Sequence, residues 1–238
     1  MSDETYGPYE GGETPRGDAP AGGFEAPPVR RGLPWERREE LGPGVAVLQT
    51  IRQVVFSPAS AFADMKLEGG WGESLAFAVL VGSVCLWAAQ AWDMLTRSLL
   101  VGMPGFDMQE IATANAAEIW FALMAPFLVL ISTFFGAAIV HLLLIMFGGA
   151  PRPYEATFRV VCYSWAVGVF NLLPFCGIFI GAVWRIVVQV IGIREAQGVP
   201  TGRAAAAVLV PVILACFCLA LVTVAALSVA GLAQMGMP

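Results

Sequence analysis

The sequence predicts an all-α integral membrane protein with five transmembrane helices preceded by short interfacial helices. First, 58% of the 238 residues are hydrophobic and 13% are charged, with a mean hydropathy of +0.72. Soluble globular proteins carry about 25% charged residues. Second, long apolar segments follow one another after residue 73, and about 20 apolar residues are enough for a helix to cross the hydrocarbon core. Much of the surface must therefore face lipid, which makes the bilayer the first expected partner.

The amino-terminal segment, residues 1–44, is rich in glycine, proline and glutamate. Because it has too few apolar residues to offset its ordering entropy, we predict a disordered cytosolic tail. Its tyrosines and the charges around Trp35 leave open that it binds a protein partner. The net charge of −5 arises mostly in the first forty residues and argues against nucleic acid as a partner.

Residues 45–73 carry apolar side chains near helical spacing, among them Val45, Leu48 and Ile51. Ser57 and Pro58 have the residue types of a helix N-cap and first helical position. Each piece is too short to cross a bilayer. We expect amphipathic helices that lie on the cytosolic leaflet or, alternatively, pack on the cytosolic ends of the bundle.

The transmembrane domain is predicted over residues 74–231, and residues 232–238 form a short exterior tail. The expected segments are 74–92, 118–147, 156–172, 175–193 and 204–231. Proline inside the second segment predicts a kink or tilt. The third segment is short for a full crossing, so its far turn, at Asn171 and Pro174, could lie below the interface if protein covers it.

Arginine and lysine set the expected orientation. Seven of them precede the first segment, and Arg152, Arg159, Arg194 and Arg203 flank the loops that face the same side. Arg97 is the one basic residue predicted on the opposite side. The excess predicts a cytosolic amino terminus and an exterior carboxyl terminus.

Several short motifs carry a family resemblance. They are Phe56-Ser-Pro58 through Phe62, Gly148-Gly149, Tyr154-Glu-Ala-Thr-Phe158, Tyr163-Ser164, Pro174 through Gly177, and Ile191-Gly-Ile-Arg-Glu195. In this order, over about residues 45–230, they resemble the Yip family of Ypt/Rab-interacting membrane proteins. The resemblance implies a five-helix domain, a cytosolic amino terminus and an association role, which in eukaryotic members concerns Rab-type GTPases and vesicle traffic. Twelve arginines against one lysine are typical of a GC-rich bacterial genome, so we expect a bacterial-type member in the cytoplasmic (inner) membrane.

No recognised catalytic motif is present. The sequence lacks HExxH, GxSxG and P-loop patterns. A single histidine excludes a histidine-based metal cluster, and the five cysteines do not have the spacing of a zinc site. We therefore expect a protein that is not an enzyme and has no catalytic residues, cofactor or metal.

The candidate site is a polar cluster of His141, Tyr163, Arg185 and Gln189. Counted from the cytosolic ends of their segments, His141 and Arg185 both lie about 10 Å deep, with Tyr163 and Gln189 in the same half. Arg185 could extend to the headgroups, join a structural hydrogen-bonded cluster, or line a ligand pocket. A cation without a nearby buried acid would favour an anionic lipid.

The leading functional hypothesis is a non-enzymatic scaffold or interaction protein with a trafficking-like role in membrane organisation. Its protein partner would bind the cytosolic tail or loops. The alternative is a small transporter, channel or lipid-handling protein. An intramembrane enzyme is disfavoured because no paired acids and no nucleophile with a base are expected within the segments.

Overall fold

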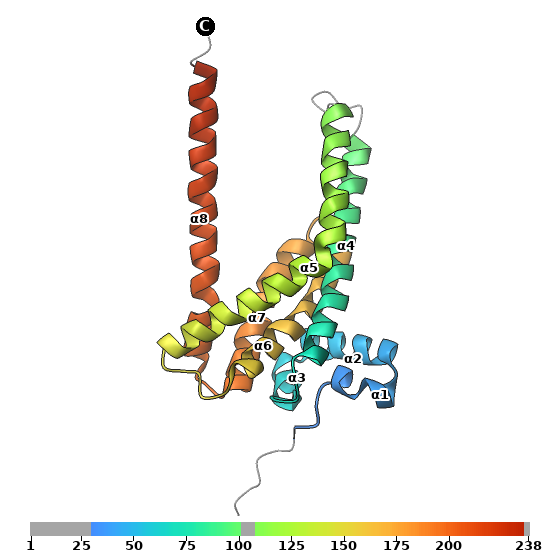
Figure 1. Cartoon of the computed structure of the whole chain (residues 1–238), viewed down its shortest axis with the longest axis vertical. Coiled ribbons are helices and arrows are strands. Elements are labelled where there is room, and N and C mark those ends of the chain that lie inside the picture. Colours follow the sequence, from blue (N-terminus) through green and yellow to red (C-terminus); the bar gives the residue numbers. More distant parts are fainter. Residues whose placement is uncertain (1–29, 101–107, 236–238) are drawn as a thin grey trace, which may run out of the picture.

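The computed structural model describes residues 30–100 and 108–235, and every element in this part of the chain is helical (Figure 1). The elements are η1 (Pro34–Arg37), α1 (Arg38–Leu41), α2 (Pro43–Phe56), α3 (Pro58–Asp64), α4 (Gly72–Leu100), α5 (Met108–Met146), α6 (Tyr154–Tyr163), η2 (Ser164–Leu172), α7 (Gly177–Gln197) and α8 (Thr201–Met235). The symbol η marks a 3₁₀-helix.

Four helices, α4, α5, α7 and α8, are long and apolar enough to cross a membrane. This confirms the prediction of an all-helical polytopic membrane protein. The third predicted segment has a different form from the other four. It consists of the ten-residue helix α6 followed by the nine-residue 3₁₀-helix η2, and the described residues therefore establish four candidate crossings rather than five.

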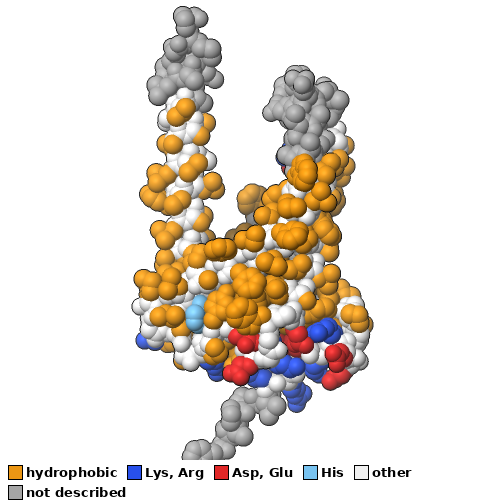
Figure 2. Space-filling view, in the orientation of Figure 1, with side chains coloured by type: hydrophobic (Ala, Val, Ile, Leu, Met, Phe, Trp, Pro, Cys, Tyr) orange, Lys and Arg blue, Asp and Glu red, His pale blue; other side chains and the backbone are white. Residues whose placement is uncertain are grey.

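Charged side chains gather at one end of the molecule. Figure 2 shows them at the lower end, where Figure 1 places η1, α1, α2 and α3, while hydrophobic side chains cover the helices beyond. We call this the charged end. The separation of charge from apolar surface is the arrangement expected where a helical bundle leaves the hydrocarbon core.

The amino-terminal segment differs from its prediction. Residues 1–29, the larger part of the predicted disordered tail, lie outside the residues that the structure describes. Residues 30–44 were also predicted to be disordered, yet they form η1, α1 and the start of α2. Leu33, Trp35 and Glu36 are buried. Composition failed here because this segment has no core of its own and is ordered by packing against the bundle.

Helices α2 and α3 begin at prolines, as predicted for Pro58, although the Ser57 side chain makes no capping bond. The two helices pack on the bundle, and the Trp184 indole on α7 donates to the Val55 carbonyl (3.0 Å). Phe56 is 77% exposed and lies beside the apolar surface of α7 at Val183. Helix α2 therefore packs against protein and also presents apolar side chains continuous with the surface of α7.

Helix α5 is bent part-way along its length in Figure 1, and Pro126 lies inside it. Proline cannot donate the backbone hydrogen bond at its position and crowds the preceding turn, which bends a helix. Gly148, just beyond α5, has a φ of 67°. This left-handed conformation is the helix-ending geometry that glycine permits at no steric cost.

Helix α8 stands apart from the bundle along most of its length (Figure 1). Near its start Ala204, Ala207 and Val208 are buried. In its most apolar stretch 11% of residues are buried, against 39% for α4. Because residues 213–229 are all exposed, this length of α8 is suited to contact lipid.

Candidate functional site

A row of polar side chains follows one face of α6 at the charged end. Glu155, Arg159 and Tyr163 are spaced four residues apart, which places them above one another on a helix. Arg159 and Tyr163 are completely buried. A buried arginine needs partners for its charge and its donors, and this row therefore identifies the principal polar site among the described residues.

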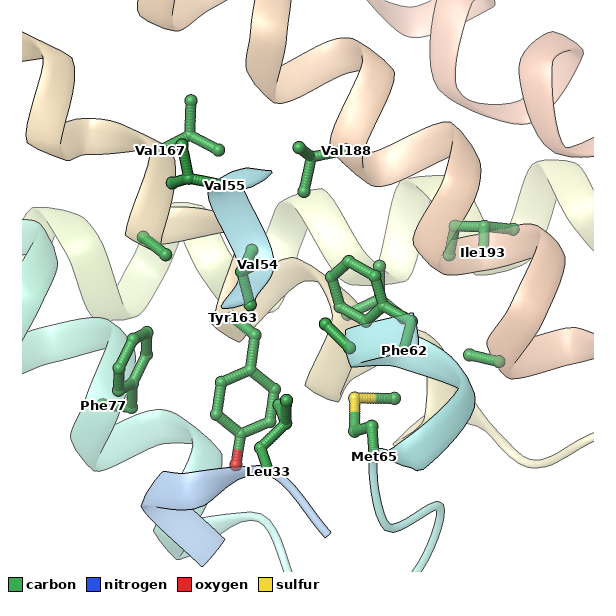
Figure 3. Close-up of a cluster of buried hydrophobic side chains, with 14 of the residues drawn as sticks. Leu33, Val54, Val55, Phe62, Met65, Phe77, Tyr163, Val167, Val188 and Ile193 are labelled. Atoms are coloured by element: carbon green, nitrogen blue, oxygen red, sulfur yellow. The ribbon is translucent and has the colours of Figure 1, made fainter. Parts of the chain in front are cut away.

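The Arg159 guanidinium pairs with Glu36 of η1, a residue 123 positions earlier in the chain. Nη1 lies 2.8 Å from Glu36 Oε1, and both side chains are fully buried. The Tyr163 hydroxyl donates to the same oxygen (3.1 Å). Figure 3 shows Tyr163 directed toward η1 beside Leu33.

The second carboxylate oxygen of Glu36 is also satisfied. Oε2 accepts hydrogen bonds from the backbone N–H groups of Leu33 (2.8 Å) and Lys66 (3.0 Å). The carboxylate therefore has four donors, one of them a cation. This set occupies both carboxylate oxygens and leaves neither directed toward an open cavity.

The remaining donors of Arg159 contact the loop before α4, one directly and one through Glu155 of α6. Nη2 donates to the Gly70 carbonyl (2.8 Å), and Nε donates to Glu155 Oε1 (3.2 Å). The same Glu155 oxygen accepts from the Gly70 N–H (2.8 Å). Gly69 and Gly70 have φ values of 121° and 96°, a backbone conformation that residues other than glycine rarely adopt. We call Glu36, Glu155, Arg159, Tyr163 and the Gly70 backbone the Glu36 network.

Trp35 extends the attachment of η1 to two further helices. Its backbone N–H donates to Thr50 Oγ1 on α2 (2.9 Å), and its indole N–H donates to the Glu73 carbonyl on α4 (2.7 Å). Its ring packs against Phe77, with 5.9 Å between centroids, and Phe77 packs against Tyr163. Together with the Glu36 network, these contacts fix residues 33–38 on α2, α4 and α6.

Arg30 makes a second attachment at the charged end. Nη1 donates to the carbonyls of Phe62 and Met65, and Nη2 donates to the carbonyl of Glu195. Partial burial, followed by the neighbouring Arg152 guanidinium, lowers the pKa of Arg30. The guanidinium thus joins the amino-terminal segment to α3 and to the end of α7.

The four predicted site residues do not form one cluster. His141 Nδ1 lies 3.0 Å from Thr157 Oγ1, while the Tyr163 hydroxyl donates to Glu36 rather than to Arg185. Gln189 Nε2 donates to Ser164 Oγ (3.1 Å). The Arg185 guanidinium stacks on the Trp165 ring, with Cζ 3.9 Å from the ring centroid.

The depths of His141 and Arg185 also differ from the prediction. Thr157 contacts His141 and accepts a hydrogen bond from Gln197 (2.9 Å), so His141 lies at the level of the last residue of α7. Arg185 lies twelve residues earlier in that helix, about 18 Å along its axis. The prediction counted from sequence ends, whereas α5 crosses obliquely in Figure 1 and keeps His141 near the charged end.

No metal-binding group is found in the part of the chain that the structure describes, where no three His, Cys, Asp or Glu side chains lie suitably close together. In the Glu36 network both Glu36 oxygens and Glu155 Oε1 accept hydrogen bonds, and the Arg159 guanidinium pairs with both carboxylates. This arrangement is that of a structural attachment between the amino-terminal segment and the bundle.

Comparison with models of known protein families identifies the family to which the chain belongs. The model of the Yip1 domain matches residues 52–223. The chain belongs to the Yip1 domain family. Neither the search of curated proteins nor the search of solved structures gave a match.

The matched Yip1 domain contains Arg159 and Tyr163 but not Glu36. The central carboxylate of the Glu36 network therefore comes from a segment that precedes the matched residues and packs onto the Yip1 domain. Sequence reasoning missed this role because Glu36 was assigned to a disordered tail and Arg159 was counted only among the basic residues that flank a cytosolic loop. The four-residue spacing of Glu155, Arg159 and Tyr163 was the one available signal.

Proposed function

We propose that this Yip1 domain protein is a non-enzymatic membrane scaffold that presents an ordered cytosolic cap, residues 30–66, and the tail before it. The observation that carries the proposal is the fully buried pair of Glu36 and Arg159. A segment fixed in this way holds a constant surface for a protein partner, which lowers the ordering cost of binding. The loop at Gly148 and the start of α8 at Arg203 lie at the same end and would complete that surface.

Five crossings are part of the proposal. Ten α-helical residues rise about 15 Å and nine 3₁₀ residues about 18 Å, so α6 and η2 together reach about 33 Å. That length supports a crossing of a hydrocarbon core about 30 Å thick. The 3₁₀ form lengthens a segment that an α-helix would leave short.

The far boundary is supported by Trp92. Its indole N–H donates to the Leu172 carbonyl at the end of η2 (3.1 Å), about 30 Å along α4 from Gly72. Beyond it Arg97 pairs with Asp93 (2.6 Å) and Glu118 (2.9 Å). An interfacial tryptophan followed by paired charges is the pattern of a membrane boundary.

The orientation follows from the basic residues at the charged end, which is proposed to be cytosolic. The arginine-rich composition supports a bacterial-type protein in the cytoplasmic membrane. A second candidate function, lipid handling, is favoured by one observation: Arg185 lines a groove beside α8.

Co-purification and reconstitution together test the scaffold proposal. We expect a protein partner to co-purify in fixed ratio with the full chain from its own membranes. Deletion of residues 1–29, or reversal of the exposed charge at the start of α8 by Arg203→Glu, should remove the partner. The same protein in liposomes should give no tracer flux or lipid scrambling above protein-free liposomes.

The alternative function predicts the opposite result. Scrambling or flux that rises with protein content and is lost in Arg185→Gln, with no partner at fixed ratio, would replace the scaffold proposal by lipid handling or transport.

A further inference from the structure

A groove of about 480 Å³ lies between α5, α7 and α8. It exists because α8 contacts the bundle near its start and then stands apart, as Figure 1 shows. Ser132 and Gly136 give α5 a small-residue surface at the groove, and Val212 and Ala215 line it from α8. Ile213 and Leu214, which lie between these two residues in α8, are exposed, so the groove lies next to lipid-facing surface.

The groove contains one cation, Arg185, in the middle of α7. Its guanidinium face stacks on Trp165 (3.9 Å to the ring centroid), which stabilises a cation on one side. Among the hydrogen bonds and ion pairs of the described residues, Arg185 has no partner. Its five N–H donors point outward from the edge of the guanidinium plane, and stacking does not satisfy them.

Such a side chain is costly within a bilayer. An arginine at the centre of a transmembrane helix costs about 2.5–3.5 kcal/mol on insertion scales and is usually paired. Gln189 lies one turn away and also lines the groove, but it is neutral and its amide N–H donates to Ser164. An anion entering the groove would supply the acceptors that the described protein residues do not.

We propose that the groove binds one anionic phospholipid, with its phosphate on Arg185 and an acyl chain along α8. The rest of the lining favours a lipid over a soluble anion, because it is largely apolar, with Ile139, Val208 and Val212 among its side chains. A planar guanidinium donates two parallel hydrogen bonds to phosphate oxygens. The site is independent of the scaffold function, since it needs no protein partner.

Native mass spectrometry of the purified full chain, titrated with phosphatidylglycerol in a mild detergent, tests this proposal. The wild type should retain one lipid. Arg185→Gln should weaken retention by roughly tenfold, because it removes a charge-assisted bidentate contact. Arg185→Lys should fall between the two, since lysine keeps the charge but loses the planar geometry.

Two further variants separate the groove from other lipid contacts. Gly136→Leu leaves Arg185 intact and places a side chain in the groove, because a Cβ at Gly136 meets only Val161, at 4.0 Å. It should lower retention as much as Arg185→Gln does. Arg203→Gln is the control, since Arg203 is exposed and donates to the Gly148 carbonyl away from the groove; it should leave retention unchanged.

The proposed lipid site would be contradicted if the wild type, Arg185→Gln and Gly136→Leu all retained lipid equally. It would also be contradicted if Arg203→Gln lost as much lipid as Arg185→Gln. A third contradicting result is a wild-type dimer that Gly136→Leu converts to a monomer. The last would show that a second copy fills the groove. If Arg185→Gln fails to fold, Gly136→Leu decides the question, because it retains the cation. Loss of partner binding with retained lipid would refute the scaffold proposal alone.

Discussion

At the scale of single residues, the most consequential side chain is Glu36. A buried ion pair is not by itself strongly stabilising, because both charges must leave water. Removing one member is a different matter, since the other charge then remains buried without its partner. The Glu36 carboxylate accepts four hydrogen bonds, so its loss leaves several buried donors unsatisfied.

Glu36→Gln should therefore lower the free energy of unfolding by about 3–5 kcal/mol. Tyr163→Phe, which removes one neutral donor, should cost about 0.5–1.5 kcal/mol. Denaturant titration in detergent, followed by circular dichroism, measures both. Glu39→Gln is the matched control because Glu39 is exposed three residues away. Equal stability of Glu36→Gln and Glu39→Gln would show that the pair contributes nothing.

The sequence identified polar residues in apolar surroundings but could not pair them. His141 and Arg185 were singled out as polar residues within apolar segments, and their neighbours, Thr157 and Trp165, come from α6 and η2. Glu36 and Arg159 lie 123 residues apart, and no local pattern encodes a contact over that separation. These side chains are brought together by the packing of the helices, and the periodicity of apolar residues along the sequence does not predict that packing.

At the scale of elements, the amino-terminal segment shows why composition misleads. Residues 30–41 have no apolar core of their own, and composition alone therefore predicts disorder. Leu33 and Trp35 instead complete a core that the bundle provides, and Glu36 satisfies a buried arginine. Conversely, the start of α3 at Pro58 and the end of α5 near Gly148 were predictable, because both depend on local backbone chemistry.

Two truncations test the assignment of this segment. Deleting residues 1–29, which contain few apolar residues, should leave the melting temperature in detergent nearly unchanged. Deleting residues 1–41 should lower it by about 10 °C, since the loss of a few kcal/mol shifts a domain of this size by about 2–4 °C per kcal/mol. Thermal melts of the two truncated proteins measure the difference. Equal melting temperatures would mean that residues 30–41 are not part of the folded unit.

The form of the third segment was not predictable from hydropathy. Its length suggested an incomplete crossing, because the count assumed 1.5 Å per residue. In the structure the second half is 3₁₀-helical and rises about 2.0 Å per residue. Whether a short apolar segment takes the longer form depends on contacts with α4 and α7, which only the assembled bundle supplies.

At the scale of the whole molecule, hydrophobic composition was enough to predict an all-helical membrane protein, and the four apolar helices confirm that class. It did not predict that α8 would stand apart or that a groove would lie beside it. Those features depend on which apolar side chains contact protein and which contact lipid. The sequence does not distinguish the two, because the same apolar residue types serve both surfaces.

The central claim is a five-crossing domain with its charged end in the cytosol, and the number of crossings fixes the sides of the two ends. Single cysteines at positions 31 and 237, in a cysteine-free background, can be labelled with a membrane-impermeant maleimide in intact and in opened cells. Five crossings predict labelling of position 237 in intact cells and of position 31 only after opening. Protection of both positions in intact cells, or labelling of both, would indicate an even number of crossings and contradict the account.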